Sequence, residues 1–207
     1  MRRFVFSLAV LAAIAVLPAF ADVNNGMFNL TAPANPFQTV GSGDCSTIQD
    51  WCVTQGTVDW IGNLWQSPPP GGNSIDLDGN TVGEISQDIV TVPGLTYLLS
   101  FWLAGNPAGP PPIKTLSVTA SAASTEFTFD VTNTSYPDNM GWTAESFAFT
   151  AASPTTTISF TSLDTPPSNP YGPVVGDVSV SAVPEPAAIL LMGTLLLGLA
   201  GALKRRV

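Results

Sequence analysis

The sequence predicts an all-β protein folded as an antiparallel jelly-roll β-sandwich. Short runs rich in Val, Ile, Thr and Phe are separated by segments rich in Pro, Gly, Asn and Asp, which is the pattern of strands and turns. Several runs alternate apolar and polar residues with a period of two, as a strand does when one face packs in a core and the other meets water. Between the two ends of the chain no long segment has the periodicity of a helix.

Ten runs are candidate strands. They are Gly26–Leu30, Thr57–Ile61, Ser74–Leu77, Glu84–Val92, Thr96–Ala104, Thr115–Ser121, Glu126–Val131, Ala144–Thr150, Thr156–Ser162 and Val174–Ser181. Many short strands with turn signals between them favour a sandwich or jelly roll. The proline-rich stretches 67–72, 106–112 and 165–173 are too short for domain linkers and are expected to be loops.

The amino-terminal segment 1–21 has the pattern of a secretory signal peptide. Arg2 and Arg3 precede an apolar run over 4–17, and small residues then end at Ala21. This order predicts cleavage after Ala21. An uncleaved membrane anchor is the alternative, but the apolar run is short for crossing a bilayer.

The carboxyl-terminal segment 187–203 is apolar and uncharged, and Lys204-Arg205-Arg206 follow it. Its length is at the lower limit for a transmembrane helix. The basic tail is expected to stay cytoplasmic, which places the preceding residues outside. The alternative is a buried core helix, but such a helix is rarely apolar on all sides.

The residues before that segment add a sorting motif. Pro184, Glu185 and Pro186 precede the apolar run and the basic end, and the order over 184–207 resembles the PEP-CTERM sorting signal. The resemblance implies processing by an exosortase, with a membrane contact through 187–203. It also implies a location in the envelope, on the surface or in the extracellular matrix of a Gram-negative bacterium. Whether the anchor is cut or retained stays open.

Residues 22–183 resemble the choice-of-anchor C family. The matching segments are Asn25–Phe28, Asp50–Val53, Val58–Ile61, Ser74–Gly79, Gly83–Gln87, Val92–Phe101, Thr157–Phe160 and Gly172–Val178. The resemblance implies a galactose-binding-like jelly roll. Related jelly rolls often hold a structural calcium ion, for which the ligands here would be a carbonyl near Asn25, the Asn29 side chain and Asp177. Asn29 stands where the family often has an acid, which weakens this calcium prediction, and Asp177 is alternatively a solvated acid at a strand edge.

The charge and cysteine content restrict the partners. Residues 22–183 contain fourteen acidic residues and the single cation Lys114, a net charge of −13. A phosphate backbone needs clustered Lys and Arg, so nucleic acid is excluded as a partner. Cys45 and Cys52 are expected to form a local disulfide in an oxidising compartment. Zinc is a poor alternative because the chain has no histidine.

The missing residue types also argue against an enzyme. Without histidine, and with Lys114 as the one cation of the exported region, neither a Ser-His-Asp triad nor a Cys-His pair can form. A glycosidase-type pair of carboxylates is the remaining catalytic alternative. The acids close in sequence that could supply it are Asp76, Asp78, Glu84 and Asp88.

Carbohydrate binding is the favoured function. Aromatic side chains stack on sugar rings, and the candidates are Trp60, Trp65, Trp142 and Tyr171. Trp65 and Tyr171 come first because they lie in Pro/Gly/Asn segments. Trp60 also has a structural interpretation, and Trp102 is expected in the core because it lies in an apolar run. The sequence therefore predicts a non-catalytic surface or matrix protein that binds or organises exopolysaccharide; the alternative is a structural biofilm component without a sugar site.

Overall fold

The structure is a computed structural model that describes residues 21–165 and 170–184. Within these residues there are eleven β-strands and one 3-10 helix, Val131–Asn133, and no α-helix. None of the described segments is a helix long and apolar enough to cross a membrane. The predicted signal peptide up to residue 20, the motif residues Glu185 and Pro186, and the apolar segment 187–203 lie outside the described residues.

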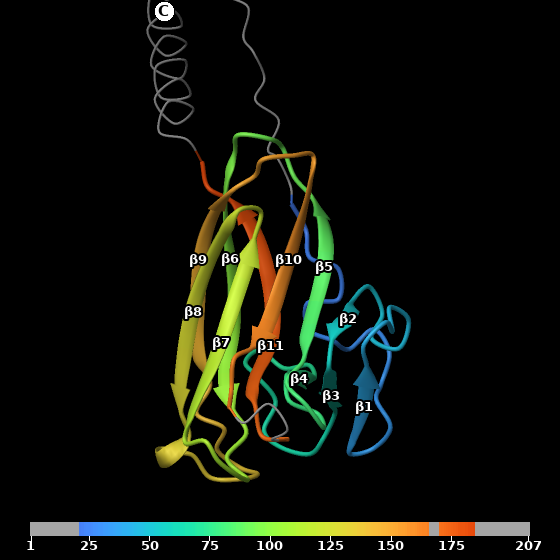
Figure 1. Cartoon of the computed structure of the whole chain (residues 1–207), viewed down its shortest axis with the longest axis vertical. Helices are drawn as coiled ribbons and strands as arrows, with labels where there is room; N and C mark the ends of the chain where they lie inside the picture. Colours follow the sequence, from blue (N-terminus) through green and yellow to red (C-terminus); the bar gives the residue numbers. More distant parts are fainter. Residues whose placement is uncertain (1–20, 166–169, 185–207) are drawn as a thin grey trace, which may run out of the picture. The chain divides into compact units, whose positions relative to one another are not determined.

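The strands form two antiparallel sheets packed face to face (Figure 1). The six-stranded sheet has the order β1 (Phe37–Gly41), β3 (Thr57–Ile61), β4 (Ser74–Asp76), β11 (Pro173–Ala182), β6 (Thr96–Gly105) and β9 (Thr143–Thr150). The five-stranded sheet has the order β2 (Cys52–Gln55), β5 (Glu84–Val90), β10 (Thr155–Ser162), β7 (Ile113–Ala120) and β8 (Ala123–Asp130). All eleven strands belong to one compact unit, Ala19–Val183.

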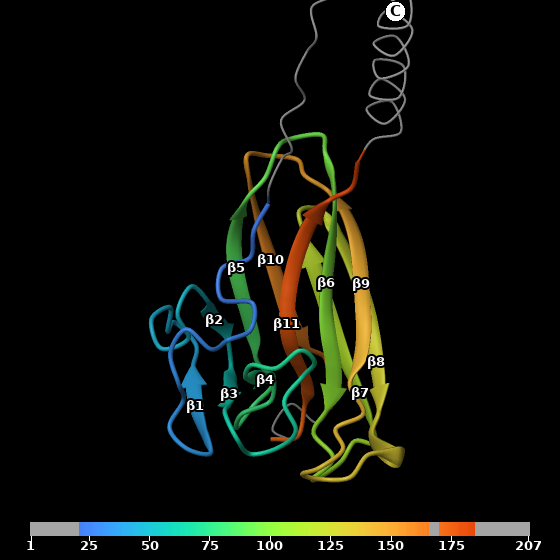
Figure 2. The ribbon, with the colours of Figure 1, turned by 180° about the vertical axis from the view of Figure 1, so that it is seen from behind.

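The strand order is that of a jelly roll. Counting β4 to β11 as the first to the eighth strand, one sheet has the order first, eighth, third, sixth, and the other second, seventh, fourth, fifth. This arrangement is two interlocked Greek keys, and it confirms the predicted β-sandwich. Strands β1 and β3 widen the first sheet beyond β4, and β2 widens the second beyond β5, as seen from behind in Figure 2.

The core lies between the sheets and follows from the alternation in the sequence. In β6 the inward residues Tyr97, Leu99, Phe101 and Leu103 are all buried. Phe101 meets Phe160 of the opposite sheet edge to face, with ring centroids 5.2 Å apart. Each such side chain contributes about 1.5–3 kcal/mol by leaving water, so this interface provides most of the drive to fold.

The start of the domain differs from the prediction. Gly26–Leu30 is a turn, because the side-chain oxygen of Asn25 accepts hydrogen bonds from the backbone N–H groups of Asn29 and Leu30. Phe28 is fully buried by this turn at a φ of 53°. The strands β1 and β2 were not predicted, since both are short edge strands with few buried residues.

Candidate functional site

The predicted disulfide joins Cys45 and Cys52. It closes a short loop beside β2, the edge strand that pairs with β5. Trp51 lies within this loop and is buried, with its ring 5.2 Å from Phe28. The indole N–H of Trp51 donates to the carbonyl of Asn25, 3.1 Å away. The disulfide loop is therefore fixed to the core on one side and free to form a surface on the other.

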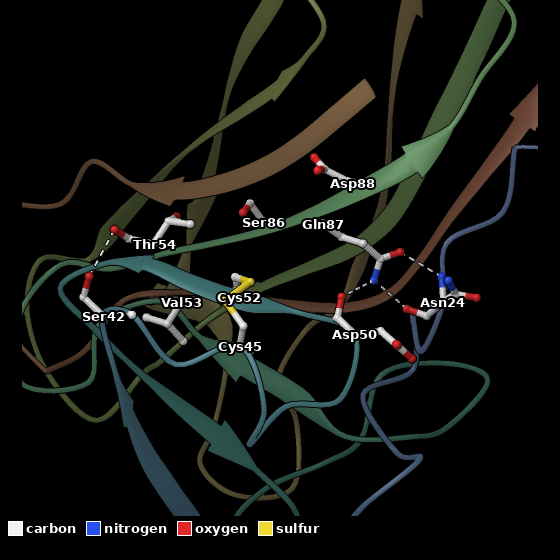
Figure 3. A pocket seen from close by; sticks show the side chains of 11 residues that line it. Asn24, Ser42, Cys45, Asp50, Cys52, Val53, Thr54, Ser86, Gln87 and Asp88 are labelled. Atoms are coloured by element: carbon white, nitrogen blue, oxygen red, sulfur yellow. Dashed lines mark hydrogen bonds between the residues drawn. A yellow bond between two sulfur atoms is a disulfide. The ribbon is translucent and has the colours of Figure 1, made fainter. Parts of the chain in front are cut away.

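That surface is an open groove with a volume of about 560 Å³ (Figure 3). Its lining residues are Asn24, Ser42, Gly43, Cys45, Asp50, Cys52, Val53, Thr54, Ser86, Gln87 and Asp88. The lining combines hydroxyl, amide and carboxylate groups with apolar carbon and sulfur surface, and no aromatic residue is among these residues. The groove thus offers hydrogen bonds and no stacking surface.

Gln87 fixes one wall of the groove. Its side-chain amide donates to the carbonyls of Asn24 and Asp50, both at 2.8 Å, and its oxygen accepts from the backbone N–H of Asn24, also at 2.8 Å (Figure 3). These three bonds hold the amino-terminal segment and the disulfide loop together against β5. A buried amide with both N–H donors and its oxygen bonded in this way stabilises one geometry of the groove.

The groove continues onto the outer face of the five-stranded sheet, where hydroxyl groups bond to acids. Glu84 accepts from Thr54 at 2.5 Å and from Thr161 at 2.6 Å, and Asp88 accepts from Thr157 at 2.5 Å. Because these side chains bond to one another, much of their capacity for hydrogen bonds is already used.

Two predicted sugar-binding aromatics are buried. Trp60 has an exposed fraction of 1% and Trp65 of 6%. Their indole N–H groups donate to internal acceptors, the carbonyl of Phe28 at 3.0 Å and the hydroxyl of Ser74 at 3.1 Å. The expectation that Trp65 is exposed in its loop was wrong, because the loop turns the ring into the core.

The other two candidates, Trp142 and Tyr171, are half-buried. Trp142 packs against the core, and its indole N–H donates to the carbonyl of Gln66 at 3.1 Å. The ring of Tyr171 lies against Gly109, where a Cβ atom would be 2.2 Å from two ring carbons. Neither residue lines the groove, so the structure does not bring the four predicted aromatics into one site.

The sequence did not predict that Trp102 lies on an outer face of the sandwich, because its apolar run favoured a place in the core. It is half-buried and alternates with the inward residues of β6, so it lies on the outer face of the six-stranded sheet. Because β6 carries apolar residues on both faces, alternation did not show which way the Trp102 side chain points. Ser100, two residues earlier on the same face, was the signal that could have revealed it.

The calcium ligands implied by the family resemblance fit poorly. The structure places Gly26, next to Asn25, beside the bulge of β11 that contains Asp177, since the N–H of Val178 donates to the carbonyl of Gly26 at 2.9 Å. However, the carbonyl of Asn25 already accepts two hydrogen bonds and its side-chain oxygen accepts two more. Two lone pairs per oxygen leave no free ligand there, and calcium requires six to eight oxygens.

No group of three or more His, Cys, Asp or Glu side chains among the described residues is arranged to hold a metal ion. Of the ligands that the resemblance implies, only the side chain of Asn29 and the carboxylate of Asp177 remain. We therefore derive no role for a metal ion in this domain.

The acids considered for catalysis are separated by the fold. Asp76 and Asp78 are buried, with exposed fractions of 1% and 0%, whereas Glu84 and Asp88 lie on the outer face of β5. Burial raises the pKa of Asp78 to about 6 and the pKa of Asp76 well above its usual value. A raised pKa marks a candidate acid only when substrate can reach it, and these two carboxyl groups are enclosed.

Lys114 is buried in the same region as these acids. Its ammonium group donates to the carbonyl of Gly109 at 3.0 Å and to the carbonyl of Tyr171. Burial lowers its pKa, and the carboxylates of Asp164, Asp76 and Asp78 oppose that shift. The single cation of residues 22–183 is thus a structural group that joins two loops.

The comparisons with known proteins define a family. Residues 21–181 match the family described as "Protein of unknown function (DUF642)". Halomucin from Haloquadratum walsbyi (strain DSM 16790 / HBSQ001) is 31% identical over 176 residues, which cover 79% of this chain and 2% of halomucin. The matched region therefore spans a very small part of that relative.

Three solved structures are similar at TM-scores of 0.41, 0.41 and 0.42. A structure described as "CBM4 structure and function" is 17% identical and covers 77% of this chain and 99% of its own. TmCBM61 in complex with β-1,4-galactotriose is 13% identical, with 78% and 97% covered. A family 35 carbohydrate binding module from Clostridium thermocellum is 12% identical, with 72% and 94% covered. These likenesses are distant, and the fold assignment depends on the strand order itself. The match over 21–181 shows that the chain belongs to the DUF642 family.

Proposed function

We propose that this protein is exported and displayed at the cell surface or in the extracellular matrix, where its β-sandwich binds or organises neutral carbohydrate such as exopolysaccharide. The domain acts without catalysis. Its carboxyl-terminal segment 184–207 is the sorting signal that an exosortase processes.

The observation that carries the proposal is the burial of Lys114. Residues 22–183 contain no other cation, and Lys114 is fully enclosed, so the domain presents no cationic side chain to solvent. With a net charge of −13, it repels anionic polymers and anionic small molecules. A ligand must be recognised by hydroxyl, amide, carboxylate and aromatic groups, and a neutral polyol suits these donors and acceptors.

The groove beside the disulfide supports the same conclusion. Its volume of about 560 Å³ is within the range of small-molecule sites. Ser42, Thr54, Ser86 and Asp88 present hydroxyl and carboxylate groups around it. Sugar hydroxyls donate and accept hydrogen bonds with such groups. The proposal rests on this lining and on the charge, and the distant carbohydrate-binding modules among the similar structures add no weight of their own.

The test is a glycan array followed by pull-down with insoluble and soluble polysaccharides. Because all strands and the disulfide lie in the compact unit Ala19–Val183, we expect residues 22–183 to fold alone, and a cooperative thermal transition checks this. Saturable binding to neutral glycans, with little binding to sulfated or uronic acid polymers, is the expected result. Failure of a folded domain to bind any neutral polysaccharide would overturn the proposal.

A purely structural role is the second candidate, and the missing stacking surface in the groove favours it. A structural component would be retained in the matrix without saturable affinity for any glycan. The same array separates the two roles, since a structural component gives no concentration-dependent signal.

Export has its own test. We expect alanine at Pro184, Glu185 and Pro186 together to leave a longer, membrane-associated chain in a host with an exosortase. Val183→Ala, which lies just outside the motif, is the control and should be processed normally. Normal processing of the triple variant would overturn the sorting assignment.

A further inference from the structure

Trp102 differs from the other four tryptophans of the chain in its hydrogen bonding. Trp51, Trp60, Trp65 and Trp142 each donate the indole N–H to an acceptor inside the domain, at 3.0 or 3.1 Å. No described residue accepts a hydrogen bond from the indole N–H of Trp102. Indole N–H groups are normally bonded when buried, so this one is available to a partner from outside.

The neighbours of Trp102 across the strands are small. In the six-stranded sheet it pairs with Gly176 of β11 on one side and with Ala144 of β9 on the other. Neither residue has a side chain long enough to cover the indole ring. Pro68 lies directly over Gly176, where a Cβ atom would be 2.5 Å from the proline ring, so the loop 62–73 covers the sheet next to Trp102, which is half-buried.

A row of serines lies next to Trp102 on the same face. Ser100 of β6 pairs with Ser146 of β9 and with Ser179 of β11, which brings three hydroxyl groups into one line across the sheet. The row is two residues along the strand from Trp102, about 7 Å at the rise of a strand. None of these three hydroxyls has a hydrogen-bond partner among the described residues. This contrasts with the five-stranded sheet, where Thr161 and Thr157 are bonded to Glu84 and Asp88.

The bulge in β11 adds an acceptor to the same region. Asp177 is the extra residue between Gly176 and Ser179, and it holds a positive φ of 48°. Residues other than glycine seldom adopt a left-handed backbone conformation, and those that do are concentrated at functional sites. Bulges likewise redirect side chains at sites of recognition.

We propose that Trp102, with Ser100, Ser146 and Ser179, forms a platform on which the pyranose rings of a neutral polysaccharide stack. The indole provides the apolar face and one free donor, and the serine row provides hydroxyl groups for the adjoining sugar unit. The occupant is uncharged because residues 22–183 have a net charge of −13 and no exposed cation. This inference rests on the proposed carbohydrate-binding function and places its principal site on the six-stranded sheet, away from the groove beside the disulfide.

The test is affinity electrophoresis of residues 22–183 in gels that contain laminarin, xylan, galactan or glucomannan. Trp102→Ala should weaken retardation by about tenfold in affinity, equivalent to 1.4 kcal/mol. Trp102→Phe keeps a stacking ring and loses the N–H, so its affinity should lie between those of the wild type and Trp102→Ala. Tyr136→Ala, which removes an aromatic residue that is 48% exposed elsewhere on the domain, is the matched control and should behave as the wild type.

The outcomes separate the two proposals. A wild-type domain that binds, with Trp102→Ala binding equally well, overturns the platform and leaves carbohydrate binding in place. A folded wild-type domain that binds none of the four polymers overturns both. A wild-type dimer in gel filtration that Trp102→Ala converts to monomer shows a contact between copies and also overturns the platform. Tryptophan fluorescence gives a second readout, because polymer should quench or shift the emission of the wild type and not that of Trp102→Phe.

Discussion

The ammonium group of Lys114 donates a hydrogen bond to the main-chain carbonyl of Tyr171. A second bond to the carbonyl of Gly109 joins the loop after β6 to the segment before β11. Three buried acids lie around this lysine, and their carboxylates favour its charged form. The one cation of residues 22–183 therefore holds two proline-rich loops together and partly neutralises the interior.

Removal of that cation should destabilise the domain strongly. Lys114→Met leaves two carbonyls without a donor and Asp76, Asp78 and Asp164 without a positive neighbour. The expected loss is about 3–5 kcal/mol in the free energy of unfolding, measured by urea denaturation. Lys114→Arg, which keeps the charge, should lose less. A loss below about 1 kcal/mol for Lys114→Met would show that the lysine is not structurally important.

Asp78 should make stability depend on pH between about 4 and 6. Burial raises its folded pKa from the model-peptide value of 3.8 to about 6, so the folded protein binds a proton that the unfolded chain releases. The proton-linked stabilisation is complete below pH 3.8 and is lost as the pH rises through 6. The raised pKa of Asp76 acts in the same direction, whereas the lowered pKa of Asp44 acts in the opposite direction at lower pH.

Asp78→Asn should therefore stabilise the domain at neutral pH. Both carboxylate oxygens of Asp78 are buried without a hydrogen bond of good geometry among the described residues, although the Ser162 hydroxyl lies close enough to lower the pKa of Asp78, and the substitution removes one of the three acids around Lys114. We expect a gain of about 1–2 kcal/mol at pH 7 and a flatter profile of melting temperature from pH 4 to 7. Asp88→Asn on the exposed face is the control. If the melting temperature of Asp78→Asn depends on pH as steeply as that of the wild type, another group causes the pH dependence.

The sequence predicted the strands best where one face is clearly polar. Strands β7, β8, β9 and β10 alternate over much of their length, and the sequence placed them within about three residues of their observed bounds. The first segment was mistaken for a strand because Met27 and Phe28 are apolar, although Asn25 closes a turn there. The edge strands β1 and β2 were not predicted because they have few buried apolar residues.

The binding surface was harder to predict for a related reason. In β6 both Leu98 and Trp102 are apolar on the outward face, so alternation did not show which aromatic faces solvent. Trp65 lies in a loop that looked exposed, yet its N–H reaches Ser74 in the interior. Loop conformation and the cover of one segment by another are tertiary properties that local sequence does not record. The Cys45–Cys52 pairing was predictable because the two residues are close in the sequence.

Gly26 should be intolerant of any side chain. A Cβ atom there would be 1.9 Å from the carbonyl oxygen of Val178, well inside contact distance. The backbone of the turn is fixed by its hydrogen bond to Val178, so it cannot retreat without losing that bond. Gly26→Ala should cost about 1–3 kcal/mol or more in thermal or urea unfolding. Gly41→Ala is the matched control, since no atom lies within 4 Å of its added Cβ; equal stability of the two variants would contradict the close contact.

Opening the disulfide should weaken both the fold and the groove. The bond between Cys45 and Cys52 closes a short loop, so Cys45→Ser with Cys52→Ser should lower the free energy of unfolding by about 2–3 kcal/mol. The loop carries Asp50, whose carbonyl is one of the three contacts that Gln87 uses to fix the groove wall. Hydrogen exchange should therefore speed up at residues 45–52 and stay unchanged at Trp102 on the other sheet.

The same double substitution tests where carbohydrate binds. If carbohydrate binds at the platform around Trp102, its affinity should be unchanged in this variant at a temperature where the domain stays folded. If the double serine variant instead loses affinity while Trp102→Ala binds as tightly as the wild type, the sugar binds in the groove.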